Sequence, residues 1–278
     1  MSIVNYLRRI FIYAITGAQV KHVTASISYI SPNERLKGKK ILITGGNRGL
    51  GYSMARKFID EGASVIITGR DEDKLKEVSD ELGCLYLKYD IQDVTKCDDI
   101  IAQVVEKLDG LDCLVNNAGI SLHEGNIRNV TPSQFDAQFN TNLKGGYFLS
   151  QSFIKYFESE KRENGQILFV SSERGTYVDD IPYGLTKASI NSLVQGLSKR
   201  VIKSNIRVNA VAPGVTASDL TGYSPDGDLY RSQSIRDRVY LPEEIAEVAC
   251  FLLSDVSACI SGQVIVCDEG KSANSYWK

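Results

Sequence analysis

The chain has few of the residues that build metal centres or disulfide frameworks. Its 278 residues include two histidines, His22 and His123, and neither has a second candidate ligand beside it, so we expect no bound metal. The six cysteines are scattered without a Cys-x-x-Cys pair, and several fall in apolar runs. Such cysteines are typical of buried free thiols in a reducing compartment, which favours a cytoplasmic protein.

Long apolar runs and a strong excess of one charge are also missing. No run approaches the roughly 20 apolar residues that a membrane span needs, and residues 10–15 are too short and lack a following cleavage site for a secretory signal. The formal net charge of −2 gives no electrostatic reason to expect a nucleic acid as partner. With 43% hydrophobic and 24% charged residues, the composition is that of a globular chain.

From residue 39 to about residue 266, short β-branched runs alternate with longer amphipathic stretches. The predicted strands are 41–44, 64–68, 84–89, 111–115, 167–170, 206–211 and 264–266, all interpreted as buried. The predicted helices are 49–61, 72–82, 94–108, 131–157, 182–202 and 242–253. This alternation predicts a single α/β domain over 37–278, a doubly wound parallel sheet of about seven strands with a Rossmann-like fold.

Two segments fall outside this alternation. Residues 216–241 are irregular and follow the sixth strand, at the sheet edge where ligands bind in such folds, so we expect a lid there. Residues 1–36 form a basic extension with no acid before Glu34 and an amphipathic helical pattern. We expect a helix that docks on its own domain or on a sister subunit. Peripheral membrane contact through residues 1–30 and an organelle presequence are the alternatives.

A glycine-rich turn lies between the first predicted strand and the first predicted helix. Residues 44–51 read Thr-Gly-Gly-Asn-Arg-Gly-Leu-Gly. Glycines let the backbone turn sharply and approach a pyrophosphate, which then lies at the positive end of the helix dipole. A glycine-rich stretch alone is weak evidence, but its place between a buried strand and an amphipathic helix predicts nucleotide binding.

This turn resembles the Thr-Gly-x-x-x-Gly-x-Gly fingerprint of the short-chain dehydrogenase/reductase family, and further family motifs follow in the family's order. These are Asn116-Asn117-Ala118-Gly119, Asn142, Ser171-Ser172, Tyr183-x-x-x-Lys187 and Pro213-Gly214. Each motif is weak alone, but the ordered set is specific. The resemblance spans about 37–270 and leaves the N-terminal extension unexplained.

The resemblance implies a cofactor site along the carboxyl ends of the strands. Its expected members are Gly45, Asn47, Arg48, Gly49, Leu50, Gly51, Arg70, Asp90, Ile91, Asn117, Ala118, Gly119, Tyr183, Lys187, Pro213, Gly214, Val215 and Thr216. Among them, Asp90 corresponds to the family residue that contacts adenine, and Lys187 to the lysine that holds the nicotinamide ribose.

The resemblance also implies a catalytic tetrad of Asn142, Ser172, Tyr183 and Lys187. Residues four apart share one helix face, so the Lys187 ammonium is expected near the Tyr183 hydroxyl, where it would lower the tyrosine pKa and suit it to acid/base catalysis. Ser172, chosen over Ser171 because Gly175 follows it at the family's spacing, would steady the substrate oxygen. Asn142 would hold a water that links Lys187 to solvent.

Two arginines bear on the choice of cofactor. An enzyme selecting NAD is expected to place an acidic residue at the end of the second strand for the ribose 2′-hydroxyl. Here Thr68-Gly69-Arg70 occupies that place, and Asp71 is expected to cap the next helix. With Arg48 in the glycine turn, Arg70 favours the 2′-phosphate of NADP(H). NAD(H) is the alternative cofactor.

We therefore expect an NADP(H)-dependent carbonyl reductase or alcohol dehydrogenase that forms a homodimer or homotetramer. Charges in the lid, together with Glu173 and Arg174, favour a polar substrate. A sugar epimerase or dehydratase of the extended branch and a catalytically silent NADP(H)-binding regulatory module are the alternatives. One departure from the family pattern is Asp268-Glu269-Gly270, where Asp-Gly-Gly is common.

Overall fold

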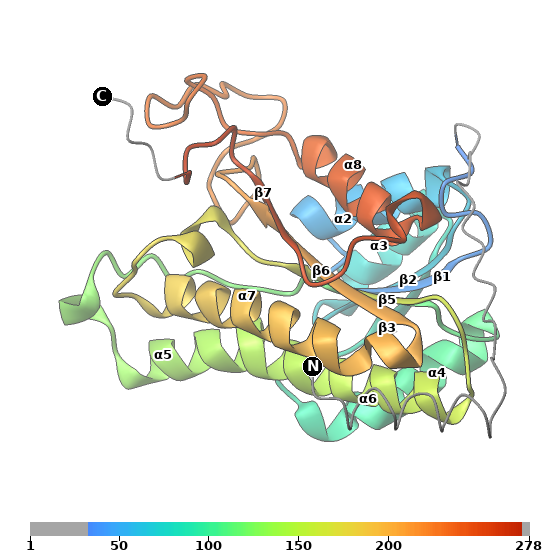
Figure 1. Cartoon of the computed structure of the whole chain (residues 1–278). Coiled ribbons are helices and arrows are strands. Elements are labelled where there is room, and N and C mark those ends of the chain that lie inside the picture. Colours follow the sequence, from blue (N-terminus) through green and yellow to red (C-terminus); the bar gives the residue numbers. More distant parts are fainter. Residues whose placement is uncertain (1–32, 274–278) are drawn as a thin grey trace, which may run out of the picture.

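A parallel sheet of seven strands forms the centre of the protein (Figure 1). The computed structural model describes residues 33–273, and its strands follow the order β3-β2-β1-β4-β5-β6-β7. Their bounds are β1 Lys40–Thr44, β2 Ser64–Gly69, β3 Leu85–Lys88, β4 Cys113–Asn116, β5 Gly165–Val170, β6 Ile206–Pro213 and β7 Val264–Cys267. After β3 the chain returns to the other side of β1 and adds β4 to β7 there, which is the doubly wound arrangement that the alternation predicts.

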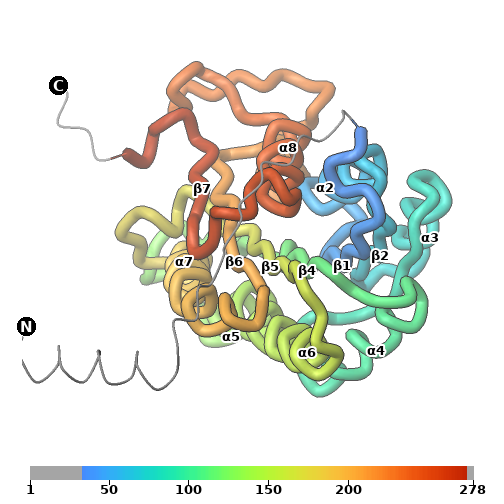
Figure 2. Tube along the Cα trace, turned by 45° about the vertical axis from the view of Figure 1, so that its right-hand side comes forward, coloured from blue at the N-terminus to red at the C-terminus, as the bar shows by residue number. Residues whose placement is uncertain are grey.

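Helices cover both faces of this sheet (Figures 1 and 2). One layer contains α2, α3 and α8, and the other contains α4, α5, α6 and α7. Their bounds are α2 Gly49–Asp60, α3 Glu72–Leu82, α4 Cys97–Leu108, α5 Pro132–Phe139, α6 Gly146–Ser159, α7 Pro182–Val201 and α8 Pro242–Leu253. The predicted Rossmann-like fold is confirmed.

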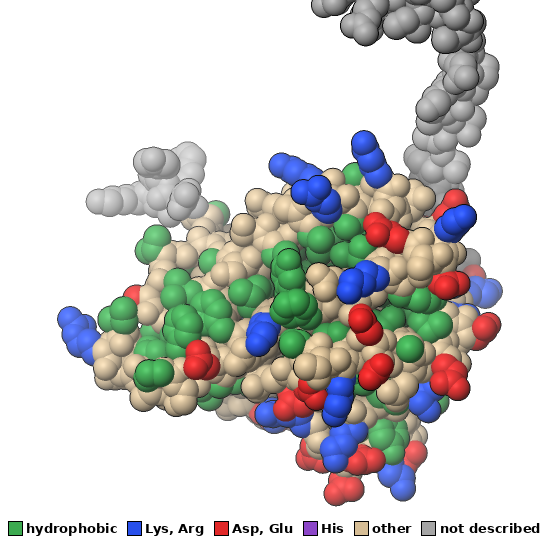
Figure 3. Space-filling model, turned by 90° about the horizontal axis from the view of Figure 1, so that it is seen from below, with side chains coloured by type: hydrophobic (Ala, Val, Ile, Leu, Met, Phe, Trp, Pro, Cys, Tyr) green, Lys and Arg blue, Asp and Glu red, His purple; other side chains and the backbone are tan. Residues whose placement is uncertain are grey.

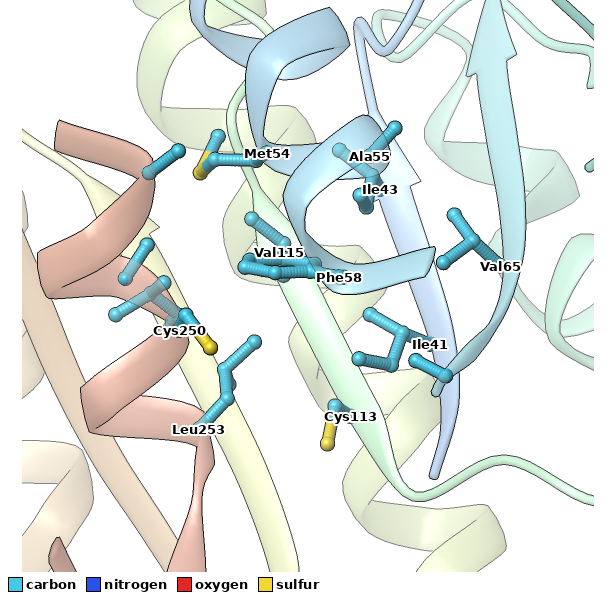
Figure 4. Packing of buried hydrophobic residues seen from close by; sticks show 14 of the residues in the cluster. Ile41, Ile43, Met54, Ala55, Phe58, Val65, Cys113, Val115, Cys250 and Leu253 are labelled. Carbon is cyan, nitrogen blue, oxygen red and sulfur yellow. The ribbon is translucent and has the colours of Figure 1, made fainter. Parts of the chain in front are cut away.

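The core is divided by the sheet into two apolar layers, because successive strand residues point to opposite faces. In β1, Ile41 and Ile43 pack in the layer under α2 and α8, whereas Leu42 packs in the layer under α4, α6 and α7. Figure 4 shows Phe58 of α2 and Leu253 of α8 in the first layer. Since the central strands are covered on both faces, they read as continuous apolar runs.

Two of the strands that we expected to be buried are not. In β3 the Leu85 side chain is 43% exposed, and every residue of β7 is only partly buried. Both strands lie at the edges of the sheet, where helices cover less of each face. The strand pattern does not distinguish an edge strand from a central one, because both are short and rich in apolar residues.

The expected helix over 131–157 is present as one continuous helical run, but its middle is a π-helix, Asn140–Gly145, which joins α5 to α6. The irregular turn lets the helix backbone approach the chain after β3. A Cβ atom added to Gly145 would lie 2.3 Å from the carbonyl oxygen of Ile91. π-Helical turns are rare and often occur at functional sites, and this one contains the candidate residue Asn142.

The proposed docking helix and membrane contact of the N-terminal extension lie outside the described residues. Only residues 33–36 of the extension are described. There Leu36 is fully buried, and the Arg35 backbone nitrogen donates to the Glu61 carboxylate at 3.1 Å. Among residues 33–273, no helix combines the length and the apolar character needed to cross a membrane.

All six cysteines are free. Three of them are buried, but Cys259 is exposed, contrary to expectation.

Candidate active site

Three of the expected catalytic side chains meet beyond the carboxyl end of β5. Ser172 follows this strand and caps a 3-10 helix, Glu173–Thr176, where its hydroxyl accepts a hydrogen bond from the Arg174 backbone at 3.2 Å. Tyr183 lies in the first turn of α7, and the Ser172 hydroxyl is close enough to its phenol to affect the pKa of that group. One oxygen could be held by both hydroxyls at once.

The neighbouring serine has a different role. The Ser171 hydroxyl donates to the Asn191 side chain at 2.5 Å and lies 3.3 Å from the Lys187 carbonyl oxygen, so it ties the end of β5 to α7. Gly175 explains the close fit, because a Cβ atom there would lie 2.8 Å from the backbone of Lys187. Of the two serines, only Ser172 is near Tyr183 in this arrangement.

Lys187 lies one helical turn after Tyr183 and is buried. Its ammonium nitrogen lies 5.6 Å from the centre of the Tyr183 ring and donates to the Val170 carbonyl oxygen at 2.8 Å. Burial penalises the charged form and lowers the pKa of Lys187 to about 8. The two residues are therefore neighbours on α7, and the lysine is held by β5, but the expected contact between the ammonium and the phenol hydroxyl is not among the contacts of the described residues.

The pKa of Tyr183 shifts in the direction opposite to the one expected. Burial of the phenol raises it, and this outweighs the lowering effects of the nearby Ser172 hydroxyl and the Arg174 charge. The Lys187 ammonium bonds to the Val170 carbonyl oxygen and lies 5.6 Å from the centre of the Tyr183 ring, so it does not overcome the effect of burial on the pKa of Tyr183. In this geometry Tyr183 is a protonated phenol at neutral pH and therefore a proton donor.

Asn142 connects the π-helix to the chain after β4. Its side-chain oxygen accepts from the Ile120 backbone nitrogen at 2.8 Å, and its side-chain nitrogen donates to the Ile120 carbonyl at 2.9 Å. The same nitrogen lies 3.2 Å from the Thr186 hydroxyl of α7. Both polar ends of the side chain thus hold the backbone in place, which differs from the expected role of binding a water.

The glycine turn forms a cradle that side chains would fill. Gly45 and Gly49 have positive φ angles of 64° and 53°, which favour glycine. A Cβ atom added to Gly51 would lie 2.1 Å from the Gly45 carbonyl oxygen, so the start of α2 packs directly on the turn. A glycine turn at a helix N-terminus fits the pyrophosphate of a dinucleotide. Leu50 is in the first turn of α2 and packs against the core.

Asn117 and Thr44 hold this cradle from the neighbouring strand. The Asn117 side chain donates to the carbonyl oxygens of Thr44 and Gly45, each at 2.9 Å. The Thr44 hydroxyl accepts from the backbone nitrogens of Asn117 and Ala118, at 3.0 and 3.1 Å. Thr44 was not among the residues expected in the site, although it is the first residue of the fingerprint. Because β1 pairs with β4, the residues that follow these two strands lie side by side.

Gly119 brings the end of the same motif to the catalytic group. A Cβ atom added there would lie 3.5 Å from the Asn142 side-chain oxygen and 3.7 Å from the Lys187 ammonium. The chain after β4 therefore runs between the glycine turn and the catalytic side chains. Gly119 thus links the motif expected to bind cofactor with Asn142 and Lys187.

The residues at the end of β2 also lie at this edge of the sheet. Arg70 is exposed, and within residues 33–273 it has no ion-pair partner. The side chain of Asn47 faces Gly69, 3.2 Å from where a Cβ atom would lie. Asp71 caps α3 by accepting from the Lys74 backbone nitrogen at 3.1 Å, as expected. The next strand, β3, leads to exposed Asp90 and buried Ile91.

Residues 216–241, where we expect a lid, begin and end beside the same strand. Pro213 ends β6, and the Val215 carbonyl accepts from Tyr240 at 2.9 Å while Thr216 forms a bridge with Tyr240. A Cβ atom on Gly214 would lie 2.6 Å from the Tyr240 ring. Residues 216–241 thus form a loop whose two ends are joined at the base.

Several of the charges that favoured a polar substrate are paired within the chain. Glu173 is buried and contacts Lys271 at 2.8 Å, and Arg174 contacts the buried carboxylate of Asp179 at 2.6 Å. In the lid, Arg236 and Arg238 contact Glu269, which stands where the family often has glycine. Pairing stabilises the loops around the site but leaves fewer free charges for a substrate.

Known proteins match the chain over most of its length. A family model described as enoyl-(acyl carrier protein) reductase matches residues 45–272. A 3-oxoacyl-[acyl-carrier-protein] reductase from Thermotoga maritima is 35% identical over 245 residues, which cover 85% of this chain and 98% of that protein.

Solved structures give the same result. A 3-ketoacyl-(acyl-carrier-protein) reductase from Brucella melitensis, complexed with NADH, has a TM-score of 0.79 and 30% identity, and the match covers 85% of this chain and 99% of that one. A short chain dehydrogenase from Burkholderia cenocepacia, in complex with NADP, has a TM-score of 0.77 and 29% identity, covering 86% of this chain and all of that one. The protein belongs to the short-chain dehydrogenase/reductase family.

Proposed function

We propose that the protein is an NADP(H)-dependent oxidoreductase that reduces a carbonyl to a secondary alcohol, or runs the reverse reaction, with Tyr183 as the proton donor or acceptor. Family membership makes it an oxidoreductase. The observation that carries the proposal is that Ser172, Tyr183 and Lys187 lie together at the end of β5, where Gly119 of the motif that contacts the glycine turn approaches Lys187.

The chemistry follows from what each residue can do. The hydroxyls of Ser172 and Tyr183 hold the carbonyl oxygen and place its carbon. Bound NADP(H) would supply the hydride, which adds to the carbonyl carbon. Tyr183 gives its proton to the oxygen, and the Lys187 cation stabilises the phenolate that remains. Asn142 positions the chain between the two halves of the site through Ile120.

Arg70 and Arg48 support the preference for NADP(H). Arg70 is exposed at the end of β2, where no acidic residue stands to accept a ribose hydroxyl. Arg48 lies in the glycine turn at the N-terminus of α2. A guanidinium group pairs with a phosphate dianion more strongly than with a hydroxyl. Structures of relatives contain NADH or NADP, so family membership alone does not choose between the two cofactors. For this chain, the two arginines favour NADP(H).

The substrate remains a prediction, and the loops argue for testing apolar ketones as well as polar ones. The charges of Glu173 and Arg174 are paired, while Leu122, Val178 and Leu220 are exposed on the loops after β4, β5 and β6. The backbone of Ile127 donates to the Asp180 carboxylate at 3.1 Å, so the first two loops touch. A substrate could contact both charged and apolar groups there.

A panel of sugar, hydroxy-acid, bicyclic and long-chain carbonyl compounds tests the function. We expect purified protein to consume NADPH and produce the matching alcohol with at least one class. The polar-substrate prediction requires sugar or hydroxy-acid carbonyls to react fastest. Conversion of a sugar without net NADPH consumption would instead indicate the epimerase alternative. NADPH binding without turnover on any compound would indicate the regulatory alternative.

The proposed homodimer or homotetramer has a candidate contact surface on the layer of α5, α6 and α7. Figure 3 shows apolar side chains gathered on this side of the molecule, and Phe135, Tyr147 and Leu185 are exposed on its three helices. Large exposed apolar patches mark association surfaces. We expect light scattering to give a mass of two or four chains, and a monomer at micromolar concentration would contradict this part of the proposal.

A further inference from the structure

Three consecutive lid residues lie against the rim of the proposed cofactor site. A Cβ atom added to Gly49 would lie 3.5 Å from the Cβ atom of Ser218. The Asp219 carboxylate pairs with the Arg48 guanidinium at 3.5 Å. The Leu220 carbonyl oxygen lies 3.1 Å from Nε2 of His123, which follows β4. The first turn of the lid thus touches both the glycine turn and the loop after the Asn-Asn-Ala-Gly motif.

The position of Asp219 is fixed by the turn around it. The Thr221 hydroxyl donates to the Thr216 carbonyl at 2.6 Å, and the Thr221 and Gly222 backbones donate to the Ser218 carbonyl at 3.0 and 2.9 Å. Thr216 itself is buried and pairs with Tyr240 at the base of the lid. Because the base and the turn are both hydrogen-bonded, the Asp219 carboxylate is presented to Arg48.

We propose that Asp219 is a specificity-determining residue that competes with the 2′-phosphate of NADP(H) for Arg48. This inference rests on the proposed function, in which Arg48 helps to select NADP(H). A carboxylate 3.5 Å from Arg48 neutralises part of its charge and repels a phosphate that approaches the same guanidinium. NAD(H) has only a hydroxyl at that position. Asp219 therefore weakens NADP(H) binding more than NAD(H) binding. It reduces the preference for NADP(H) over NAD(H) that Arg70 and Arg48 produce.

The size of the effect is limited by solvent. The side chains of Arg48 and Asp219 are 64% and 77% exposed, and an exposed ion pair changes an equilibrium constant by about 1.5- to fivefold. The Asp219→Asn variant should bind NADP⁺ and 2′,5′-ADP more tightly by about two- to fivefold. Its affinity for NAD⁺ should change by less than that, because NAD⁺ lacks the phosphate that gains access to Arg48.

The test is isothermal titration calorimetry of NADP⁺, NAD⁺ and 2′,5′-ADP with the full chain, without any carbonyl substrate. The Asp226→Asn variant is the matched control, since Asp226 is an exposed lid aspartate with no ion pair among the described residues. Arg48→Gln and the double variant Arg48→Gln/Asp219→Asn complete a double-mutant cycle. In the Arg48→Gln background, the Asp219 substitution should lose its selective effect.

Selective tightening for the two 2′-phosphorylated ligands, absent from Asp226→Asn, supports the inference. Equal tightening for NAD⁺, the same change in Asp226→Asn, or no change at all overturns it while leaving the proposed function intact. If wild-type protein binds neither dinucleotide, the proposed function fails and the inference fails with it. A thermal melt of each variant, expected to match wild type because both aspartates are exposed, verifies that the fold is unchanged.

Discussion

Burial sets the protonation states of the two residues at the centre of the proposed mechanism. It raises the pKa of Tyr183 and lowers that of Lys187 to about 8, because each shift favours the uncharged form. Near neutral pH, Tyr183 therefore holds its proton, while Lys187 is still mostly charged. This combination suits donation of a proton to a carbonyl oxygen.

The first residue-scale prediction concerns pH. As the pH rises through about 8, Lys187 should lose its proton and its stabilising effect on the Tyr183 phenolate. We expect kcat/KM for carbonyl reduction to be nearly constant below this pH and to fall above it. In Lys187→Arg, a weaker enzyme whose side chain stays charged, the fall near pH 8 should disappear. A wild-type profile that stays flat well above pH 8 would contradict the assigned role of Lys187.

The second residue-scale prediction concerns Arg70. Arg70→Asp should repel the 2′-phosphate and provide an acceptor for the 2′-hydroxyl, since it places a carboxylate at the end of β2. The ratio of kcat/KM for NADPH to that for NADH should exceed one in wild type and fall by roughly ten- to a hundredfold in the variant. Arg200→Asp, at an exposed position on α7, is the control. An unchanged ratio in Arg70→Asp would remove this residue from the cofactor site.

Among the secondary-structure elements, those with local signals were predicted best. The bounds of α3 were predicted without error, because Asp71 caps its start and Gly83 ends it with a left-handed backbone. The π-helix between α5 and α6 was not predicted, because it depends on the approach of Gly145 to Ile91, which is distant in sequence. Ion pairs such as Arg48–Asp219 were missed for the same reason: the partners are 171 residues apart.

The glycine turn provides the prediction at this scale. Gly51→Ala would place a methyl group about 2 Å from the Gly45 carbonyl oxygen, so α2 must move away from the turn. We expect NADPH affinity to fall at least tenfold and the melting temperature to drop. Gly196→Ala is the control, because nothing among the described residues lies within 4 Å of its added Cβ atom, and alanine favours an exposed helix position such as this one. Equal NADPH affinity in wild type and Gly51→Ala would show that the turn tolerates the displacement.

At the scale of the whole molecule, the parallel sheet brings residues that are distant in sequence together at the carboxyl ends of its strands. The glycine turn after β1, the motif after β4 and Ser172 after β5 follow different strands, yet β1, β4 and β5 are neighbours in the sheet. The alternation of strands and helices predicts the sheet, and the family motifs predict the residues at its edge. The sequence does not predict which side chains face each other there, as the pKa of Tyr183 illustrates.

The most direct test of the central claim is hydride transfer in the presence and absence of the Tyr183 hydroxyl. NADPH that carries deuterium at both C4 positions of the nicotinamide is mixed with wild-type protein or Tyr183→Phe and a carbonyl compound that wild type reduces, and the alcohol is analysed by mass spectrometry. We predict deuterium at the carbinol carbon. We also predict turnover lower by roughly 10²- to 10⁴-fold in Tyr183→Phe, with NADPH affinity nearly unchanged. Full turnover in Tyr183→Phe, or an alcohol without deuterium, would contradict the account.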